Sequence, residues 1–480
     1  MEVDPFLPRR ESILSRRSSS VLSAQAVVSL AAATYAIVAA TAGELDFVGF
    51  RTARFDLGNA VQAIWSTSHG HLLQMTDVHG QQVVRLGSHV EPVLLVFVPL
   101  WMVWSSPVML LVVQAIAVSA GALPIFWFAR KHLRSERAGV LFAVAYLLYP
   151  ATQWNALDPN TGFHAVNLAL PLLLYALWWL DEERWALFAV AALLAAGTKE
   201  QVPLIVGCLG LWYGFSRGRH VIGVSILAAG AALSAVDVLY VIPHFSPSGA
   251  DPFAQRYDAV GGSASGVLKT AVLHPLRVAD VALTPHKLGY LALLFVPLLG
   301  LCFRAPLLLL AAVPSLAINL LSSSADQTSI SGHYSAATVA FLLGATILGA
   351  ARLKVDPRLL ATAVLTAVAL PAVLSPLWVA VPVARGTIAD ASHQRAERDA
   401  VALIPPNASV STSNIIGAHL SARNRILLFP VVHGARWIAV DTRDTEGAAS
   451  FRAAVAALRR HGSFTQVFEA DGIVVMRRNR

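Results

Sequence analysis

The chain has 480 residues, of which 56% are hydrophobic and only 13% are charged, and its mean hydropathy is +0.61. Soluble domains carry roughly 25% charged residues. The composition therefore excludes a cytosolic globular enzyme, a disordered protein and a disulfide scaffold, and it indicates a polytopic membrane protein.

The net charge of +8 does not point to nucleic acid, because basic residues in membrane proteins gather at the cytoplasmic edges of the spans. The two cysteines, Cys208 and Cys302, lie inside apolar runs. We expect them to be buried thiols, neither a disulfide nor a metal pair.

Apolar stretches predict about eleven transmembrane helices in an all-α membrane domain. They cover residues 20–43, 106–129, 137–153, 165–180, 185–198, 201–215, 219–242, 286–303, 305–322, 335–350 and 358–382. The apolar segment 91–105 is predicted to be a re-entrant or interfacial helix. The first stretch is longer than a usual signal-peptide core, so we expect an uncleaved anchor, with cleavage as the alternative.

Basic residues predict the orientation of these spans. With the N-terminus in the cytoplasm, the inner loops hold most of the membrane domain's arginines and lysines, as the positive-inside rule requires. The short outer loops then hold one basic residue, Lys199. Three outer segments are long. The first covers residues 44–105, and the second, residues 244–285, contains Arg256 and Tyr257.

The third outer segment predicts a separate domain. We divide the chain into a cytoplasmic tail (1–19), a membrane domain (20–383) and an extracytoplasmic α/β domain (384–480). Short apolar runs in the last part predict five strands, near 408–412, 426–429, 437–440, 465–468 and 473–476, with helices near 391–404 and 446–461. A glycine-rich phosphate loop is missing from this sequence, so we expect no nucleotide.

The first outer loop carries the richest polar motif, which begins at Arg54 and Asp56. A helix over residues 56–66 would place Asp56, Asn59 and Gln62 on one side and an apolar face on the other. The acid would then face an aqueous cavity. Helix capping by Asp56 is the alternative.

Further along this loop, His89 and Glu91 precede the apolar segment 91–105. A His-x-Glu pair could bind a divalent cation together with Asp56, although spacing alone assigns no metal. The alternative is a solvated loop end.

The next outer loops add further polar positions. Asp158 lies in an Asp-Pro-Asn turn and His164 begins a span. Lys199 and Glu200 lie in a very tight connection between spans, where they either pair with each other or serve the site. His333 and Tyr334 open another span.

All these groups fall on one face of the membrane, which predicts an extracytoplasmic active cavity. A lipid-linked substrate would keep its polyprenyl tail in the bilayer and its phosphate at headgroup level. Asp56 suits the base that accepts a proton from an acceptor hydroxyl. Lys199, His164, His333 and Tyr334 suit the phosphate.

The motif Phe55-Asp56-Leu57-Gly58-Asn59, with Gln62, Trp65 and Ser68-His69-Gly70, resembles a family of uncharacterised bacterial membrane proteins allied to the GT-C superfamily of integral-membrane glycosyltransferases. Thr198-Lys199-Glu200, His333-Tyr334-Ser335-Ala336 and Leu403-Ile404-Pro405-Pro406 extend the resemblance over nearly the whole chain. It implies a GT-C fold, a bacterial plasma-membrane location, a polyprenyl-phosphate sugar donor and Asp56 as the acid of the first loop.

Two departures from the GT-C pattern matter. Many GT-C enzymes have two adjacent acids in this loop, whereas Asp56 stands alone, and Glu44 and Asp46 are the alternative pair. The resembled family has a proline after the histidine at 164, where this chain has Ala165.

Three functions remain open at this point. The first is a glycosyltransferase that moves a sugar from a polyprenyl-phosphate donor, held among membrane lipid, to a cell-envelope glycan or protein. Asp56 would be the base, and the substrate would be bound by Arg54, Asn59, Gln62, His89, Glu91, Asp158, His164, Lys199, Glu200, His333 and Tyr334. The second is a flippase for lipid-linked intermediates, and the third is a non-catalytic envelope scaffold.

Overall fold

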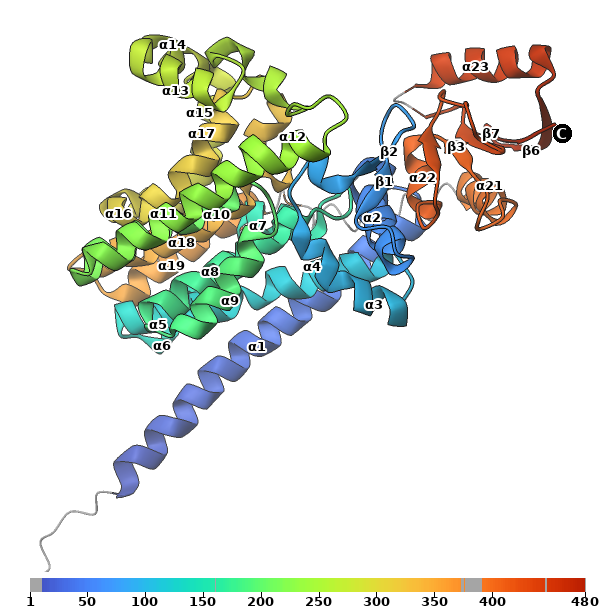
Figure 1. Cartoon of the computed structure of the whole chain (residues 1–480). Helices are drawn as coiled ribbons and strands as arrows, with labels where there is room; N and C mark the ends of the chain where they lie inside the picture. The colour runs from blue at the N-terminus through green and yellow to red at the C-terminus, as the bar shows by residue number, and fades with distance from the viewer. Residues whose placement is uncertain (1–10, 160, 373–374, 376–390, 445–446, 480) are drawn as a thin grey trace, which may run out of the picture.

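The computed structural model describes residues 11–159, 161–372, 375, 391–444 and 447–479. An apolar helical bundle forms the larger part, and a small α/β domain lies beyond one end of it (Figure 1). The N-terminal helix α1 (Glu11–Val48) extends from the opposite end. From residue 11 on, the segment predicted as a cytoplasmic tail (1–19) is therefore part of helix α1. The predicted domain boundary at 383 falls outside the described residues.

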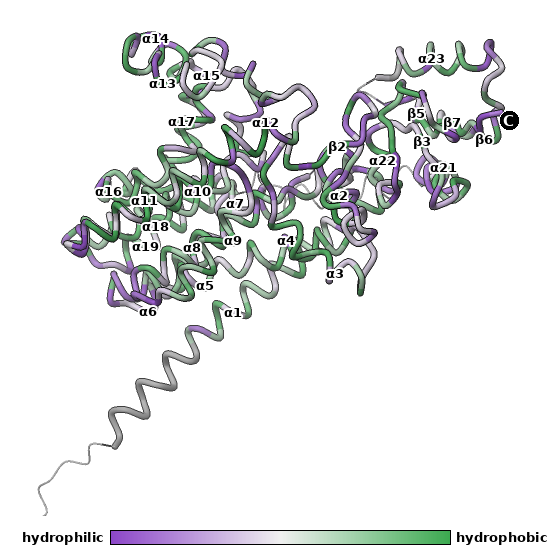
Figure 2. Tube along the Cα trace, in the orientation of Figure 1, coloured by the Kyte–Doolittle hydropathy of each residue, from purple (hydrophilic) through white to green (hydrophobic). Residues whose placement is uncertain are grey.

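The helical bundle follows the apolar segments of the sequence. Its helices are α4 (Val108–Ala120), α5 (Ala122–Leu133), α6 (Glu136–Leu148), α7 (Pro150–Leu157), α8 (Ala169–Asp181), α9 (Trp185–Ala196), α10 (Val202–Arg217), α11 (His220–Val236), α15 (Pro285–Phe295), α16 (Pro306–Leu309), α17 (Val313–Leu321), α18 (Ala336–Ala351) and α19 (Pro357–Ala372). Hydrophobic residues run along these helices, and hydrophilic residues mark their connections (Figure 2). Each predicted apolar segment is helical over most of its described residues.

Four continuous helices in the described part of the chain are long and apolar enough to cross a membrane. They are Ala24–Val48, Val108–Leu133, His220–Phe245 and His333–Ala351. A fifth would be the pair Pro275–Ala282 and Pro285–Leu298, bent by 71°. The other apolar helices are shorter, so the total of eleven spans stays a prediction.

One polar cluster ties three of these helices together at the end of α8. The carboxylate of Asp181 is 2% exposed and lies 2.6 Å from Lys131 Nζ, 3.0 Å from His132 Nε2 and 2.9 Å from Arg217 Nη2. Both carboxylate oxygens are engaged. We call this set the Asp181 cluster, and it was not predicted from the sequence.

The first outer loop forms a compact layer between the bundle and the α/β domain (Figure 1). It contains a π-helical turn, η1 (Arg54–Gly58), and α2 (Asn59–Ser68), then the hairpin β1 (Gln74–Thr76) and β2 (Gln82–Val84). The helix predicted over 56–66 is present, and the turn at its start begins two residues earlier. The hairpin was not predicted, because each strand has only three residues.

The apolar segment after this hairpin is helical from Pro92 to Val103, as η3 (Pro92–Val96) and α3 (Phe97–Val103). Met102 is 71% exposed and Val103 86%. Of the two alternatives, a re-entrant or an interfacial helix, this exposed apolar surface favours the interfacial one.

The middle outer segment contains α12 (Ile242–Phe245), η6 (Ala254–Val260), α13 (Ala264–Leu273) and α14 (Pro275–Ala282). The loop between α12 and η6 lies over the outer end of the bundle, where it lines part of the candidate active site.

The C-terminal α/β domain has a five-stranded sheet in the order β4-β3-β5-β7-β6. Its strands are β3 (Val410–Thr412), β4 (Ile426–Leu428), β5 (Trp437–Asp441), β6 (Phe464–Ala470) and β7 (Ile473–Arg478), each within a few residues of its prediction. Side chains alternate along β5 and β7, so α21 (Ala391–Ala402) covers one face and α23 (Ala448–His461) the other. The short helix α22 (Asn414–His419) was not predicted.

Candidate active site

A cavity of about 650 Å³ opens where the first long loop, residues 44–105, meets the ends of several helices. Nine of the twelve predicted site residues line it: Arg54, Asp56, Asn59, His89, Glu91, His164, Lys199, His333 and Tyr334. They come from five separate segments of the chain, so their convergence comes from the fold and not from sequence proximity. Gln62, Asp158 and Glu200 do not line the cavity.

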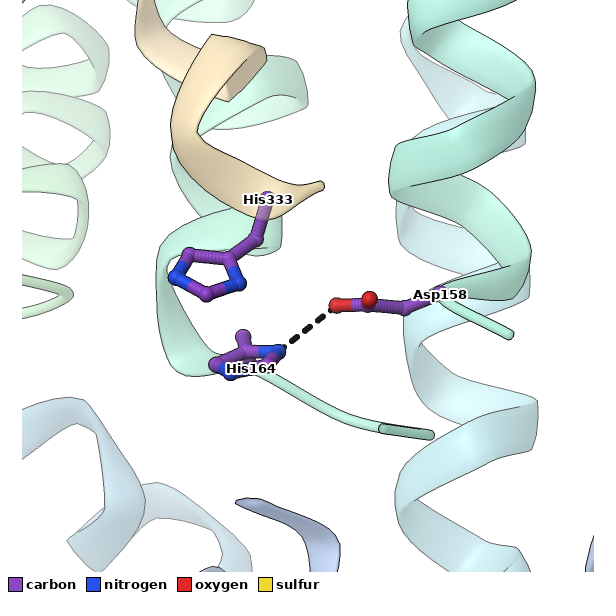
Figure 3. A group of neighbouring side chains, drawn as sticks. All are labelled: Asp158, His164 and His333. Carbon is purple, nitrogen blue, oxygen red and sulfur yellow. Dashed lines mark hydrogen bonds and ion pairs between the residues drawn. The ribbon is translucent and has the colours of Figure 1, made fainter. Parts of the chain in front are cut away.

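The centre of the site is a chain of three side chains, Asp56, His164 and Asp158. His164 Nε2 lies 2.9 Å from Asp56 Oδ1, and His164 Nδ1 lies 2.7 Å from Asp158 Oδ2. Asp158 follows α7 in a left-handed conformation, and His164 precedes the helical segment that leads into α8 (Figure 3). The Asp56 side chain is 28% exposed, whereas that of Asp158 is 2% exposed, so only Asp56 is open to a substrate.

The two carboxylates determine the charge of His164. Burial alone would lower the pKa of this imidazole, but Asp56 and Asp158 raise the pKa of His164 to about 10. Burial would likewise raise the pKa of Asp56, but the His164 cation beside it lowers that pKa below its usual value. At neutral pH Asp56 is therefore an ionised carboxylate that His164 orients.

Capping does not explain Asp56. The turn η1 begins after Ala53 without a side-chain cap, and α2 begins after Gly58 in the same way. The alternative pair of acids, Glu44 and Asp46, does not line the cavity. Three acids of the first loop line this space, Asp56, Asp77 and Glu91, and Asp56 is the one that pairs with His164.

The ring of His333 stacks on the ring of His164, with the ring centroids 3.5 Å apart (Figure 3). Asp158, His164 and His333 bring ligand-type atoms within 4.8 Å of one another. Both nitrogens of His164 already face carboxylate oxygens, however, and a metal ligand needs a free imidazole lone pair. The arrangement fits an imidazolium between two acids better than a metal ligand.

Asp56, His89 and Glu91, which could share a divalent cation, each face a different side chain in this structure. Asp56 pairs with His164, and Glu91 lies 2.8 Å from Arg85 Nε. His89 Nδ1 lies 3.5 Å from Glu200 Oε1. The three expected ligands therefore have three different partners.

Lys199 stands apart from these pairs. It is 7% exposed, and its ammonium lies 5.2 Å from the centre of the Tyr334 ring. Among the described residues its ammonium has neither a hydrogen bond nor an ion pair with a carboxylate. Burial lowers the pKa of Lys199, while Glu200 and Glu91 act to keep it charged. Because an unpaired buried cation is costly, this ammonium suits an anion that enters the cavity.

Glu200 does not pair with its neighbour Lys199 but supports the loop of His89. Its carboxylate accepts a hydrogen bond from the Val90 amide at 3.3 Å. Burial would raise the pKa of Glu200, yet His89 and Lys199 lower it to about 2. Burial also lowers the pKa of His89, which stacks on Phe253 at 4.8 Å.

Three predicted residues of the first loop are occupied by protein partners. Arg54 is buried and donates from Nη2 to the carbonyl oxygens of Thr76 and Ile426, at 2.5 and 3.1 Å. Gln62 donates to Thr76 and to the backbone of the C-terminal domain. Asn59 donates to the carbonyl of Phe55. The polar side of α2 therefore packs largely on protein, whereas Asp56, the acid expected to face an aqueous cavity, lines the cavity.

Two further cations line the cavity, Arg85 and Arg256. Arg256 was expected on the outer side but without a site role. Arg256 lies over the ring of Phe253 at 4.4 Å, and Arg85 pairs with Glu91. The positive-inside rule predicts few basic residues in the outer loops. The presence of Arg85 and Arg256 in those loops was therefore a signal that could have identified both as site residues.

Comparison with known proteins gives a family and a fold. A family of predicted membrane proteins, DUF2079, matches residues 47–475. Crystal structures of ArnT from Cupriavidus metallidurans align with a TM-score of 0.51 at 12% identity. The form bound to undecaprenyl phosphate covers 92% of this chain and 97% of that one, and the apo form 93% and 98%. No curated protein matches the chain. The chain belongs to the DUF2079 family of predicted membrane proteins, and its fold is similar to that of ArnT.

Proposed function

We propose that this protein is a glycosyltransferase that moves a sugar from a polyprenyl-phosphate donor to an acceptor of the cell envelope. One observation carries the proposal. The oriented carboxylate of Asp56 lines the same cavity as the buried ammonium of Lys199, which pairs with no carboxylate among the described residues. The GT-C fold supports it, as does the undecaprenyl phosphate bound to a protein of that fold.

The chemistry needs one base and one anion site. An acceptor hydroxyl attacks C1 of the sugar, and Asp56 takes the proton of that hydroxyl. The bond between C1 and the phosphate oxygen breaks, and its electron pair leaves with polyprenyl phosphate. Lys199 stabilises the charge on the leaving phosphate. Attack opposite the leaving group inverts the configuration at C1.

The remaining side chains have supporting roles in this proposal. His164 holds Asp56 ionised and oriented, and Asp158 holds His164 in turn. Both nitrogens of His164 are engaged, so we assign the phosphate to Lys199, with Tyr334 and Arg256 beside it. Glu91 and Glu200 hold Arg85 and His89 in the wall.

A donor of this kind also requires one orientation of the protein in the membrane. The cavity and the α/β domain would face the cell exterior, with the N-terminus in the cytoplasm. The bacterial plasma membrane would supply the lipid-linked donor. A glycan or a protein of the envelope would be the acceptor.

The test is a transfer assay with the full-length protein in lipid nanodiscs. Radiolabelled sugars linked to undecaprenyl phosphate are supplied with envelope material from the host, and label in the acceptor is measured. Transfer by the wild type that is lost in Asp56→Asn supports the proposal. Movement of lipid across the bilayer that survives Asp56→Asn, without transfer, would instead support the flippase.

A further inference from the structure

The turn that carries Asp56, η1, is anchored by hydrogen bonds from the residues on either side of Asp56 to other parts of the chain. The first amides of a helix have no partner within that helix. In η1, the amide of Leu57 donates to the carbonyl of Thr161 at 3.3 Å. The amide of Phe55 donates to Asn414 Oδ1 at 3.1 Å. The two residues that flank Asp56 are therefore anchored by different parts of the chain, and one anchor belongs to the C-terminal domain.

Helix α22 of that domain packs directly on this turn. Its Gly417 lies so near Arg54 that an added Cβ would come within 2.9 Å of Arg54 Cβ and 3.1 Å of Thr412 Cγ2. On the other side of the contact, a Cβ at Gly58 would collide with Ser421 Oγ. Two glycines from distant parts of the chain thus permit the close approach of α22 to the turn.

Further contacts fix the two parts in register. Arg54 donates to the carbonyl of Ile426 at 3.1 Å, in strand β4. The ring of His419 stacks on Phe47 and on Phe50, with centroid distances of 4.1 and 3.9 Å. Burial lowers the pKa of His419 to about 4, so this ring is neutral at physiological pH and packs as an aromatic residue.

We infer that the C-terminal α/β domain is a working part of the active site, and that Asn414 is a positioning residue that fixes the Asp56 carboxylate through the amide of Phe55. The inference rests on the proposed function for its kinetic consequence. Its structural part, the immobilisation of the turn at Arg54–Gly58, stands independently of the substrate.

The first test replaces the acceptor atom. Asn414→Ala removes the oxygen that binds the Phe55 amide, and Asn414→Asp keeps an acceptor at the same position. Asn407→Ala is the matched control, because Asn407 is an exposed asparagine of the same domain. We expect kcat of transfer to fall about tenfold in Asn414→Ala, with KM for the lipid-linked donor unchanged, because only the base is misplaced. Asn414→Asp should recover most of kcat.

Hydrogen exchange measured by mass spectrometry gives the readout that does not depend on catalysis. In Asn414→Ala, peptides covering Arg54–Gly58 should exchange about tenfold faster, while those covering β3 and β5 keep the wild-type rate. Unchanged exchange in the turn would overturn the inference. If the wild type transfers no sugar, the proposed function fails, and the exchange result alone still decides whether α22 holds the turn.

A second variant covers the case in which Asn414→Ala does not fold. Gly417→Ala inserts a methyl group between α22 and the turn, and Gly289→Ala is its control, because a Cβ at Gly289 meets no atom within 4 Å. We expect faster exchange at Arg54–Gly58 and lower kcat only in Gly417→Ala. Equal behaviour of the two glycine variants would contradict the inference.

Discussion

The helical segment from Ala165 to Asp181, which includes α8, has a buried polar cluster at each end. The cluster around His164 and the Asp181 cluster differ in how their charges are neutralised. His164 precedes Ala165, and Asp181 is the last residue, which places them about 25 Å apart at 1.5 Å per residue. At one end, three basic side chains meet Asp181. At the other, the chain Asp56–His164–Asp158 opens onto a cavity in which Lys199 has no counter-ion among the described residues. A fully paired cluster stabilises the fold, whereas a partly paired one beside a cavity is available to a ligand.

The sharpest test of this difference removes the open carboxylate. Asp56→Asn keeps the size of the side chain and removes the base, so transfer should fall about 10³-fold or more. The thermal midpoint should change little, because the Asp56 side chain is partly exposed. Transfer by the purified variant and its melting curve give both quantities, and a variant that is inactive because it is unfolded would weaken the comparison.

The next largest effect is expected at the unpaired cation. Lys199→Met should lower kcat/KM for the lipid-linked donor about 10²-fold, because the leaving phosphate loses its counter-charge. The same change should leave the thermal midpoint unchanged or raise it, since a buried charge without a partner is replaced by an apolar side chain. A clear loss of stability would show that Lys199 serves the fold.

The opposite pattern is expected in the Asp181 cluster. Asp181→Asn leaves three basic side chains without their shared carboxylate, and two of them, Lys131 and Arg217, are more than a third exposed. We therefore expect a loss of only about 1–2 kcal/mol, seen as a lower thermal midpoint. Transfer by the folded fraction should stay near the wild-type rate. A selective loss of transfer would mean that this end of the bundle also contributes to function.

The smallest effect concerns the pH dependence. The His164 cation lowers the pKa of Asp56, so its removal should raise that pKa. In His164→Asn, the acidic limb of the profile of kcat/KM against pH should therefore move to higher pH, with a lower maximum. An acidic limb that stays in place would show that His164 does not control the ionisation of Asp56.

Most of the architecture follows from local patterns in the sequence. Apolar length and the distribution of basic residues predict the helical segments, and short apolar runs predict the five strands of the C-terminal sheet. The hairpin β1–β2 and helix α22 were missed because a three-residue strand and a six-residue helix carry too little periodicity to stand out.

Most of the residues that line the cavity could be predicted from the sequence, but how they pair with one another could not. Polar residues near the outer ends of helices identified nine lining residues, because polar groups are rare in such places. Which carboxylate faces which base depends on tertiary packing. Asp158 looked like a turn residue, yet it holds His164. Of the two alternatives for Lys199 and Glu200, the mutual pair does not form among the described residues, because Glu200 faces His89. Asn414 was beyond reach, because its partner Phe55 lies 359 residues away.

The most direct test measures binding and transfer together in one pair of variants. Undecaprenyl phosphate binding and sugar transfer are determined in nanodiscs for Asp56→Asn and Lys199→Met. We predict that Asp56→Asn binds the lipid as tightly as the wild type and transfers no sugar, while Lys199→Met binds it about tenfold or more weakly. Transfer by Asp56→Asn at the wild-type rate, or wild-type binding by Lys199→Met, would contradict the assignment of Asp56 as the base and Lys199 as the phosphate-binding cation.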